Sequence, residues 1–316
     1  MEKIKSKVSI IITTYNRAKE LAERSLPSAL KQTYSNFECI VVDDCSTDET
    51  SKVIKNFIKE GAKIKYLKLK KNRGCSGARN YGVEHAKGDF IVLLDDDNEL
   101  FPNFLDITVP ELNKLPKDFG AVFCGRIVQH KKLKEYRIPS LSNSFYVSID
   151  WGWLLRKEIF SKIKYDEEIH GDDDADFGIQ FFKYYKAYAI NKPLQKAYTY
   201  LLDEKSAPSE CLPSERRLRG LDKFLIKNLP VYKQKGSKKE LAFIYRFAGR
   251  NYCQGKQIKK GIFFLWKSFL TKPTLRTLFN LTAACFGAKI YNFYWKSEKN
   301  FFALVRSKLS AQTLKN

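Results

Sequence analysis

The sequence contains few residues of the kinds that form transition-metal sites or disulfide frameworks. Its 316 residues include seven cysteines, an odd number, and three histidines, and no two cysteines form a C-x-x-C pair. Structural zinc sites use such pairs, and disulfide-rich secreted domains usually have an even number of cysteines. We therefore expect neither kind of framework, and a reducing, cytoplasmic environment suits the chain better.

Long apolar segments are also lacking. The first residues lead directly into a short strand, without the apolar stretch and cleavage site of a signal peptide. In residues 255–308 the longest run without a charged side chain is 277–288, whereas a helix that spans a bilayer needs roughly 20 apolar residues. Neither a signal peptide nor a membrane-spanning helix is predicted.

The common glycine-rich phosphate motifs are missing as well. No G-x-G-x-x-G follows the first expected strand, and G-x-x-x-x-G-K-[ST] does not occur. Gly120 and Gly125 have the P-loop spacing, but Arg126 and Ile127 follow where Lys and Ser or Thr are needed. These absences disfavour a kinase or a nicotinamide-dependent enzyme.

Strands and helices alternate in the first 100 residues. Apolar or β-branched runs predict strands at 8–13, 37–42, 64–69 and 90–94, with helices near 18–32, 46–59 and 77–86. Such alternation is typical of an α/β fold with a mostly parallel sheet and helices on both faces. Further along, we expect a strand at 121–128 and helices near 155–163 and 176–186.

The net charge of +22 is distributed unevenly. Residues 1–204 hold 33 basic and 30 acidic side chains, a net of +3, whereas residues 205–316 hold 24 basic and 5 acidic ones, a net of +19. This division predicts two regions. The first is a domain at 1–204, with halves at 1–100 and 101–204, and the second is a basic, aromatic-rich helical region at 205–316.

Three consecutive carboxylates, Asp95, Asp96 and Asp97, follow the apolar run FIVLL at residues 90–94. The run predicts a buried parallel strand, and open α/β sheets bind ligands at the carboxyl ends of their strands. Crowded acids repel one another unless water, hydrogen bonds or a cation offset their charge. A cation shared with an anionic ligand is one interpretation, and a solvated acidic loop is the other.

Polar residues also follow the first two expected strands. TTYNR at 13–17 leaves the first and DDCS at 43–46 leaves the second, so both exits should face one crevice. Tyr15 could stack on a base, and Asp43 or Asp44 could accept a hydrogen bond from a base N–H. In the alternative interpretation, residues 43–46 only cap the next helix.

Four blocks of sequence, by their order and spacing, resemble inverting glycosyltransferase family 2. The resemblance is close over residues 7–105 and weaker to about residue 190. It implies a GT-A fold, which is Rossmann-like and binds a nucleotide-diphospho-sugar, with a nucleotide-binding half at 1–100 and an acceptor half at 101–204. The blocks are VSIIITTYN (8–16), IVVDDCSTD (40–48), NRGCSGARNYG (72–82) and GDFIVLLDDD (88–97).

This resemblance implies roles for the residues of a donor site. Asp44 would contact the nucleotide base, Thr13 and Tyr15 would line its pocket, and Arg79 would lie near the diphosphate. The complete set of expected donor-binding residues is Thr13, Tyr15, Asn16, Asp43, Asp44, Arg79, Asp95 and Asp96.

The resemblance also makes residues 95–97 the D-x-D motif of a metal site. Asp97 would bind the ion, and Asp95 or Asp96 would reach the ribose or a metal-bound water, so that Asp97 and Asp95 are the expected ligands. The diphosphate leaving group gains negative charge as the glycosidic bond breaks. Mg²⁺ or Mn²⁺ takes oxygen ligands and neutralises such charge, and phosphates and waters complete its shell.

A second acidic cluster, GDDDADF, occupies residues 171–177. The family has an acidic pair here that contains the general base, which the alignment places at Asp174, with Asp173 as the second candidate. The register is open because Asp stands where Glu is usual and Asp172 is an additional acid. Inversion requires one base opposite the leaving group. In the alternative, these acids only complement a helix N-terminus, at ~0.3–1 kcal/mol each.

Two tryptophans, Trp151 and Trp153, lie upstream of this cluster. Paired tryptophans often stack on sugar rings, and they are equally often part of a hydrophobic core. Acceptor binding and core packing are therefore both open for these residues.

Lysines and arginines alternate with aromatic residues in 255–308. Basic amphipathic helices of this kind suit a membrane surface with anionic lipids. The aromatic residues could instead pack against the first domain. Nucleic-acid binding is the least favoured of the three interpretations.

Together, these features lead us to expect a metal-dependent inverting glycosyltransferase. It would move a hexosyl or N-acetylhexosaminyl group from a UDP-sugar to a hydroxyl of a glycan or lipid-linked glycan, in the synthesis of cell-surface polysaccharide or glycoconjugate. The expected location is cytoplasmic, at the inner face of the plasma membrane. The alternatives are a nucleotidyltransferase of related fold and a non-catalytic, basic protein that binds membrane surfaces.

Overall fold

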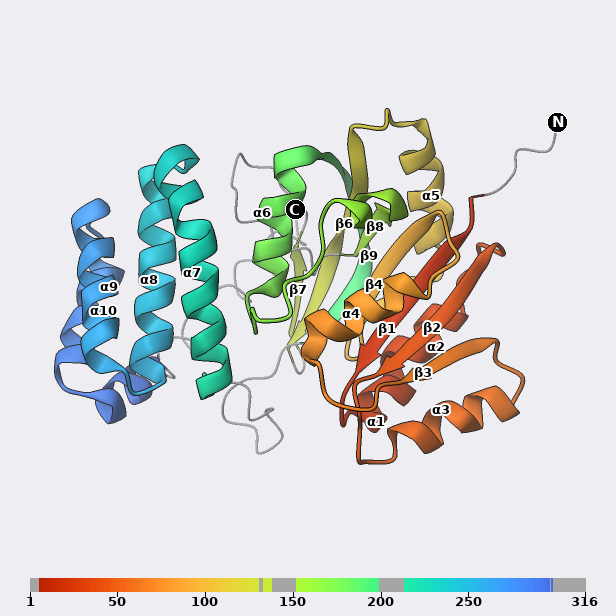
Figure 1. Cartoon of the computed structure of the whole chain (residues 1–316), viewed down its shortest axis with the longest axis horizontal. Helices are drawn as coiled ribbons and strands as arrows, with labels where there is room; N and C mark the ends of the chain where they lie inside the picture. Colours follow the sequence, from red (N-terminus) through yellow and green to blue (C-terminus); the bar gives the residue numbers. More distant parts are fainter. Residues whose placement is uncertain (1–5, 131–132, 138–151, 199–212, 296, 298–316) are drawn as a thin grey trace.

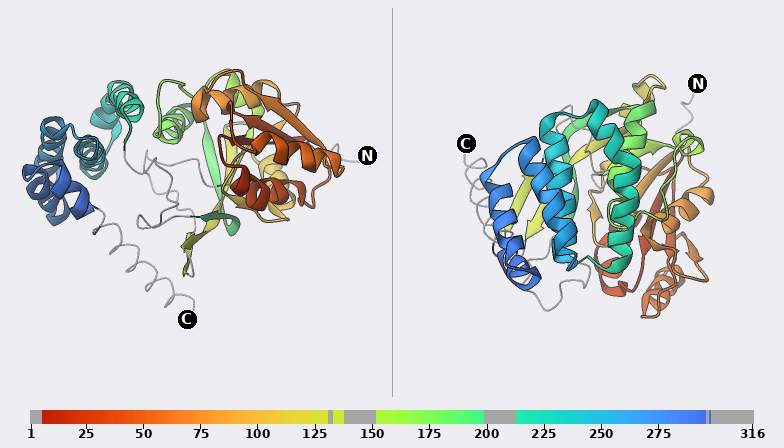
Figure 2. Two further views of the ribbon diagram at one scale, coloured as in Figure 1. Left: turned by 90° about the horizontal axis from the view of Figure 1, so that it is seen from below. Right: turned by 60° about the vertical axis from the view of Figure 1, so that its left-hand side comes forward.

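The computed structural model describes residues 6–130, 133–137, 152–198, 213–295 and 297. A sheet with helices on both faces forms one part of the molecule. The helices that follow residue 213 stand beside it (Figure 1). The same two parts are visible from below and from the side (Figure 2).

The first four strands form a parallel half-sheet in the order β3-β2-β1-β4, as predicted. Thr14 pairs with Asp43 on one side of β1, and Thr13 pairs with Asp95 on the other. The polar residues that follow the strands therefore meet at one edge of the sheet. The strands are β1 (Val8–Thr14), β2 (Phe37–Asp43), β3 (Ile64–Lys68) and β4 (Phe90–Asp95).

Helices cover both faces of this half-sheet because alternate strand residues point to opposite sides. Ile10 and Ile12 pack against helices on one face, and Ile11 packs against helices on the other. This confirms the predicted α/β class. The first face carries η1 (Leu21–Ser25), α2 (Leu26–Leu30), α3 (Thr50–Lys59) and α5 (Phe104–Lys114), and the second carries α4 (Gly74–Glu84) and α6 (Asp173–Tyr184).

The second half of the sheet is mixed. The strand β8 runs antiparallel to both β4 and β6, while β9 runs parallel to β6. Two further strands, β5 and β7, pair antiparallel with β9 and β6 respectively. Their bounds are β5 (Glu99–Leu100), β6 (Phe119–His130), β7 (Leu133–Arg137), β8 (Trp153–Arg156) and β9 (Lys186–Tyr198), so the strand predicted at 121–128 lies within β6.

The helix predicted at 155–163 is wrong. Leu154 and Leu155 lie in β8, between β4 and β6, and both are buried. An apolar run that is buried on both faces of a sheet has no helical periodicity to distinguish it. Only a short 3₁₀-helix, η2 (Lys157–Ser161), follows.

The helix predicted at 18–32 consists of three consecutive segments: α1 (Ala18–Glu20), the π-helical η1, and α2, with Pro27 in its first turn. Proline has no N–H to donate, and the first turn of a helix is where that loss costs least. The proline therefore marks a junction between two helical geometries.

The C-terminal region is helical, as predicted. Its first helix packs on the sheet domain, because Leu218, Leu221 and Phe224 share a hydrophobic cluster with Ile169 and Ile179. The predicted domain boundary at residue 204 falls outside the described residues. Among the described residues, no helix combines the length and the apolar character needed to cross a bilayer. The helices are α7 (Glu215–Lys235), α8 (Lys238–Gln254), α9 (Ile258–Thr271) and α10 (Leu275–Cys285).

Candidate active site

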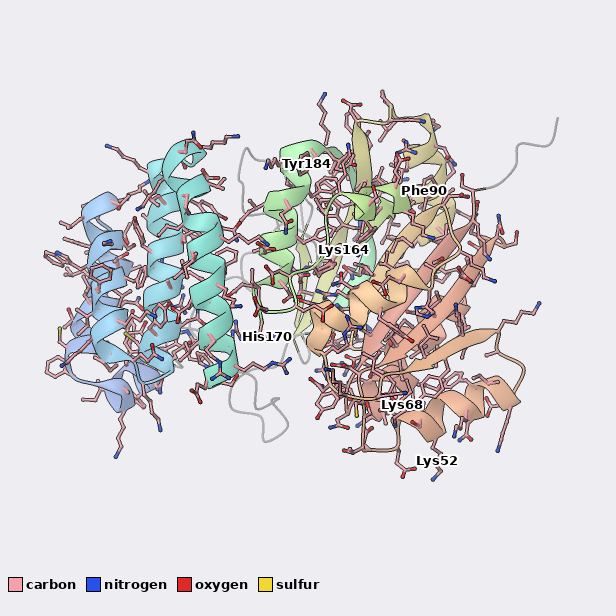
Figure 3. All side chains as sticks on the ribbon, viewed as in Figure 1. Lys52, Lys68, Phe90, Lys164, His170 and Tyr184 are labelled. Atoms are coloured by element: carbon pink, nitrogen blue, oxygen red, sulfur yellow. The ribbon has the colours of Figure 1, made fainter. Side chains whose placement is uncertain are left out.

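A cavity of about 550 Å³ lies at the carboxyl ends of β1, β2 and β4. A second cavity, of about 820 Å³, lies near Phe90 and Lys164 (Figure 3), and its walls contain none of the predicted site residues. The first cavity is therefore the candidate site, although it is smaller. The predicted residues that line it are Thr13, Tyr15, Asp44, Arg79, Asp95, Asp96, Asp97 and Asp173.

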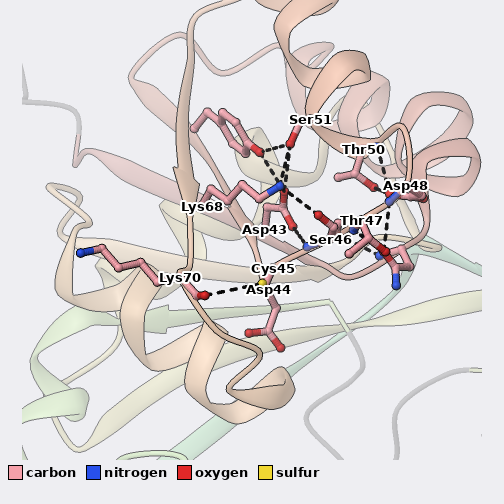
Figure 4. A network of polar contacts seen from close by, with 12 residues as sticks. Asp43, Asp44, Cys45, Ser46, Thr47, Asp48, Thr50, Ser51, Lys68 and Lys70 are labelled. Carbon is pink, nitrogen blue, oxygen red and sulfur yellow. Dashed lines mark hydrogen bonds and ion pairs between the residues drawn. The ribbon is translucent and has the colours of Figure 1, made fainter.

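Asp43 belongs to the turn behind this cavity rather than to its wall. Its carboxylate is fully buried and accepts hydrogen bonds from the Ser46 backbone N–H at 2.7 Å and from the Tyr66 hydroxyl at 2.8 Å (Figure 4). Lys68 Nζ lies 3.7 Å away. The prediction that Asp43 contacts the donor is corrected here, because its carboxylate is used to shape the turn.

The helix predicted from residue 46 begins later, and Ser46 does not cap it. Helix α3 begins at Thr50, and the Asp48 carboxylate accepts hydrogen bonds from the Thr50 backbone N–H at 3.0 Å and from its hydroxyl at 2.6 Å. Ser46 instead accepts a hydrogen bond from the backbone N–H of Asn16 at 2.9 Å.

Asn16 joins the exits of β1 and β2. It has a left-handed backbone with φ of 52°, and its Oδ1 accepts a hydrogen bond from the Thr47 backbone N–H at 2.8 Å. Asparagine tolerates this backbone conformation better than most residues. Asn16 is exposed and follows Tyr15, which lines the cavity and is itself 46% exposed, so the contact of Asn16 with the donor stays a prediction.

Asp44 fixes the N-terminus of α4 and faces the cavity. Its two carboxylate oxygens accept hydrogen bonds from the backbone N–H groups of Arg73 at 2.7 Å and Gly74 at 2.8 Å. Burial raises the pKa of Asp44, and these two hydrogen bonds oppose that effect. A carboxylate oxygen can accept more than one hydrogen bond, so Asp44 can still receive a base N–H.

The acidic run after β4 is held by arginines. Arg17 Nη1 donates to Asp96 Oδ1 at 2.9 Å and to Asp97 Oδ2 at 3.0 Å. Burial raises the pKa of Asp96 to about 7 despite this ion pair, and burial also raises the pKa of Asp97. The sequence interpretation did not assign a role to Arg17, although its position directly after Asn16 places a cation at the same strand exit.

Arg79 connects the two acidic clusters. Its Nη2 donates to Asp95 at 2.9 Å, and its Nη1 donates to Asp173 and to Asp174, each at 2.7 Å. The guanidinium is buried and lies 5.0 Å from the centre of the Tyr165 ring. Burial alone would lower the pKa of Arg79, but the surrounding carboxylates raise it overall.

The acids at the start of α6 lie in different surroundings. Asp173 lines the cavity, and Asp174 shares Arg79 with it. Asp176 is fully buried and accepts a hydrogen bond from Asn228 Nδ2 at 2.8 Å, which ties α6 to α7. Burial raises the pKa of Asp172, the residue before the helix, to about 7.

Trp153 does not line the cavity. Trp153 is 2% exposed and stacks on Phe123 with ring centres 4.7 Å apart, with Phe181 at its edge. The predicted acceptor role of Trp153 is therefore corrected to core packing. Trp151 lies outside the described residues.

The first turn of α7 supplies a further wall of the cavity, which the sequence interpretation missed. Arg216 Nε donates to His170 Nε2 at 2.9 Å, and Arg216 Nη1 donates to Asn72 Oδ1 at 3.1 Å. His170 lies between the helical region and the sheet domain (Figure 3), and burial together with Arg216 lowers its pKa. Arg217 also lines the cavity.

A sequence signal for these arginines does exist. Ser214 caps α7 by accepting a hydrogen bond from the Arg217 backbone N–H at 3.2 Å. Cations in the first turn of a helix are unfavourable because that end already carries partial positive charge. Arg216 and Arg217 follow Ser214 and Glu215 in this first turn, and their position there is consistent with an anionic ligand in the cavity.

The carboxylates fit a divalent cation that is shared with a diphosphate. Among the described residues, no group of three or more His, Cys, Asp or Glu side chains encloses a metal position. Mg²⁺ sites that include substrate phosphates need only one or two carboxylates. Asp95 and Asp97 supply oxygen donors of this kind, and Arg17 would have to move away from Asp97.

In GT-A glycosyltransferases, acidic residues at the ends of sheet strands face a second group of acids at the start of a helix. The acids after β4 and at the start of α6 have this arrangement here. The sequence profile of glycosyl transferase family 2 matches residues 9–188. The chain belongs to this family.

Two curated relatives illustrate the range of similarity. An uncharacterized glycosyltransferase of Rickettsia prowazekii is 34% identical over 205 residues, which cover 60% of this chain and 63% of that one. The GalNAc(5)-diNAcBac-PP-undecaprenol beta-1,3-glucosyltransferase of Campylobacter jejuni is 27% identical over 286 residues, which cover 84% and 89% of the two chains.

Two solved structures share the fold. S. aureus TarS in complex with UDP-GlcNAc has a TM-score of 0.59 at 17% identity, with coverage of 93% of this chain and 92% of that one. The mannosyltransferase PcManGT from Pyrobaculum calidifontis, in complex with GDP-Man and Mn²⁺, has a TM-score of 0.58 at 17% identity, with coverage of 97% and 87%. At this identity the likeness concerns the fold.

Proposed function

We propose that the chain is an inverting glycosyltransferase that moves a sugar from a UDP-sugar to a hydroxyl of a glycan or lipid-linked glycan. One observation carries the proposal: a single cavity joins Asp44, the acidic run at 95–97 and Asp173 with two arginines of α7. Such a cavity offers an acceptor for a base N–H, carboxylates for a cation and cations for a diphosphate. Family membership supports the same reaction class.

The donor would lie across the strand exits. Tyr15, whose ring is exposed, would stack on the base, and Asp44, which lines the cavity, would accept the base N–H. Arg216 and Arg217 would face the diphosphate, where charge-assisted hydrogen bonds from guanidinium groups are strong. These roles would divide donor recognition between the sheet and the helical region.

Asp97, with Asp95, would hold Mg²⁺ or Mn²⁺. Such an ion, when bound, neutralises the charge that the departing diphosphate gains. The Mn²⁺ in the PcManGT structure supports a divalent cation as the first candidate to test.

Asp174 would serve as the general base, with Asp173 as the alternative. An inverting transfer needs a carboxylate that removes the proton of the acceptor hydroxyl on the side opposite the leaving group. Arg79 links both acids to Asp95, so the base and the proposed metal ligand are held in one fixed arrangement.

A lipid-linked glycan is the acceptor class that we propose to test first. The Campylobacter jejuni relative is named for an undecaprenol-linked acceptor. Trp153 is buried and offers no exposed ring on which a sugar could stack. Acceptor recognition would therefore depend on other residues of the acceptor half.

The test is an assay of sugar transfer and donor hydrolysis with a panel of nucleotide sugars, with Mn²⁺, with Mg²⁺ and with EDTA. We expect release of UDP, whereas release of pyrophosphate would indicate a nucleotidyltransferase. Asp97→Ala and Asp174→Asn should each abolish transfer and leave the fold intact. Asp118→Asn, which changes an exposed surface acid, is the matched control and should retain activity; full activity of both site variants would overturn the proposal.

A further inference from the structure

The outer part of the helical region combines two unusual properties, and the first is its charge. Residues 241–297 contain ten lysines and arginines and no aspartate or glutamate. They include the part of α8 that follows Glu240, together with α9, α10 and the helical residues 288–295. Helices α9 and α10 stand at the edge of the molecule that is farthest from the sheet (Figure 1).

The second property is an exposed apolar stripe on α9. Phe263, Trp266 and Leu270 are 52%, 52% and 65% exposed, and their spacing of three and four residues places them on one face of the helix. The opposite face of α9, at Gly261 and Ser268, is buried. Packing within the helical region therefore does not account for the stripe.

Helix α10 carries a similar stripe. Leu275 and Phe279 are 74% and 58% exposed at helical spacing, and Phe286, directly after the helix, is 67% exposed. Phe293, in the helix that follows, is 75% exposed. Scattered single apolar residues on a surface need no explanation, but two adjacent helices with such stripes do.

Basic side chains accompany these stripes. Lys267 Nζ lies 4.3 Å from the centre of the Phe263 ring. Lys259, Lys272 and Lys289 are exposed. Long basic side chains beside exposed aromatic and aliphatic groups are the composition of helices that lie in the interface of an anionic bilayer.

We propose that the exposed face of α9, α10 and residues 288–295 binds the surface of a membrane that contains anionic lipids. The apolar stripes would enter the headgroup region, and the lysines would contact lipid phosphates. The charge of this face argues against a second copy of the chain as the occupant, because two such faces would bring many like charges together. Exposed leucine and phenylalanine side chains give no advantage in contacts with a nucleic-acid backbone, which is recognised by charge.

The test is co-sedimentation of the full chain with vesicles of phosphatidylcholine alone and of phosphatidylcholine with phosphatidylglycerol. We expect binding to the anionic vesicles only, weakened by salt. Trp266→Ser/Leu270→Ser and Lys259→Glu/Lys272→Glu should each weaken binding by roughly tenfold or more. The matched controls are Ile58→Ser/Ile226→Ser, which removes exposed apolar side chains elsewhere, and Lys55→Glu/Lys59→Glu on α3; both should bind as the original chain does.

A spectroscopic readout distinguishes insertion from adhesion. The fluorescence emission of Trp266 should shift to shorter wavelength on anionic vesicles, and Trp266→Phe should abolish the shift while it preserves binding. Unchanged emission, or unchanged binding in both double variants, would overturn the proposal. So would equal binding to a DNA duplex that depends on the lysines alone, or a dimer in sedimentation velocity that Trp266→Ser/Leu270→Ser dissociates.

This inference does not depend on the proposed enzymatic activity. Asp97→Ala, which removes a proposed metal ligand, should bind anionic vesicles as well as the original chain. Sugar transfer without binding to vesicles would contradict only the membrane proposal. Binding to vesicles without sugar transfer would contradict only the enzymatic proposal.

Discussion

Arg79 Nη2 donates a hydrogen bond to Asp95 Oδ1 at 2.9 Å, across the space between α4 and the end of β4. The same guanidinium holds Asp173 and Asp174 through Nη1. One buried side chain therefore fixes the distance between the acidic run after β4 and the acidic start of α6. Both proposed catalytic functions, metal binding and proton removal, depend on that distance.

Removal of this arginine should lower the stability of the fold. Arg79→Ala leaves three carboxylates near one another without their shared cation, so we expect a loss of about 2 to 4 kcal/mol in the free energy of unfolding. Urea denaturation followed by circular dichroism measures it. Arg73→Ala removes an ion pair with Glu167 that is about one-third exposed and should cost at most about 1 kcal/mol; equal losses in the two variants would contradict this account.

The sequence predicted the parts of the site that follow directly from strand ends. The exits of β1, β2 and β4 meet because parallel neighbours end at the same edge, which explains why Tyr15, Asp44 and Asp97 were found together. The residue pattern alone did not distinguish Asp43 from Asp44, and the expected donor site included both. Adjacent residues at a strand end point to opposite sides, so a small uncertainty in the end of the strand exchanges the buried residue with the accessible one.

Other features depend on contacts between distant segments. Arg79 and Asp173 are 94 residues apart, and Arg216 and Asn72 are 144 apart. No local pattern specifies such pairs. Trp153 illustrates a different limit, because an aromatic residue suits a sugar platform and a core equally well until its neighbours are known.

Arg17 should compete with a divalent cation for Asp97. In the absence of nucleotide, Arg17→Ala should bind Mn²⁺ roughly tenfold more tightly, because the ion no longer has to displace a guanidinium from two carboxylates. Mn²⁺ titration followed by electron paramagnetic resonance, at about pH 8.5 where the carboxylates are ionised, measures this affinity. Lys19→Ala changes a nearby exposed cation and should have little effect; an unaltered Mn²⁺ affinity in Arg17→Ala would argue against the competition.

Asp172 should make the fold less stable as the pH rises. Burial raises its pKa from 3.8 to about 7, so between these values the folded chain binds more protons than the unfolded chain, and stability falls with increasing pH. The full cost at pH 8 is at most roughly 4 kcal/mol. Asp172→Asn should therefore raise the melting temperature at pH 8 more than at pH 5. Asp118→Asn, at an exposed site, should leave the pH dependence of the melting temperature between pH 5 and 8 unchanged. If Asp172→Asn also left it unchanged, the burial of Asp172 would not destabilise the fold at high pH.

Arg216 and Arg217 should recognise the diphosphate rather than the nucleoside. They line the cavity from the first turn of α7, where the helix dipole disfavours cations unless an anion lies nearby. Arg216→Ala and Arg217→Ala should each weaken UDP binding by roughly tenfold, as expected for loss of a charge-assisted contact, and leave uridine binding unchanged. Isothermal titration calorimetry with both ligands separates these effects. Arg219, on the same helix, pairs with Glu215 at the surface, so Arg219→Ala supplies a control with the same loss of charge. If all three variants weakened UDP binding equally, the effect would come from the general charge of α7, and the two arginines would have no specific contact with the diphosphate.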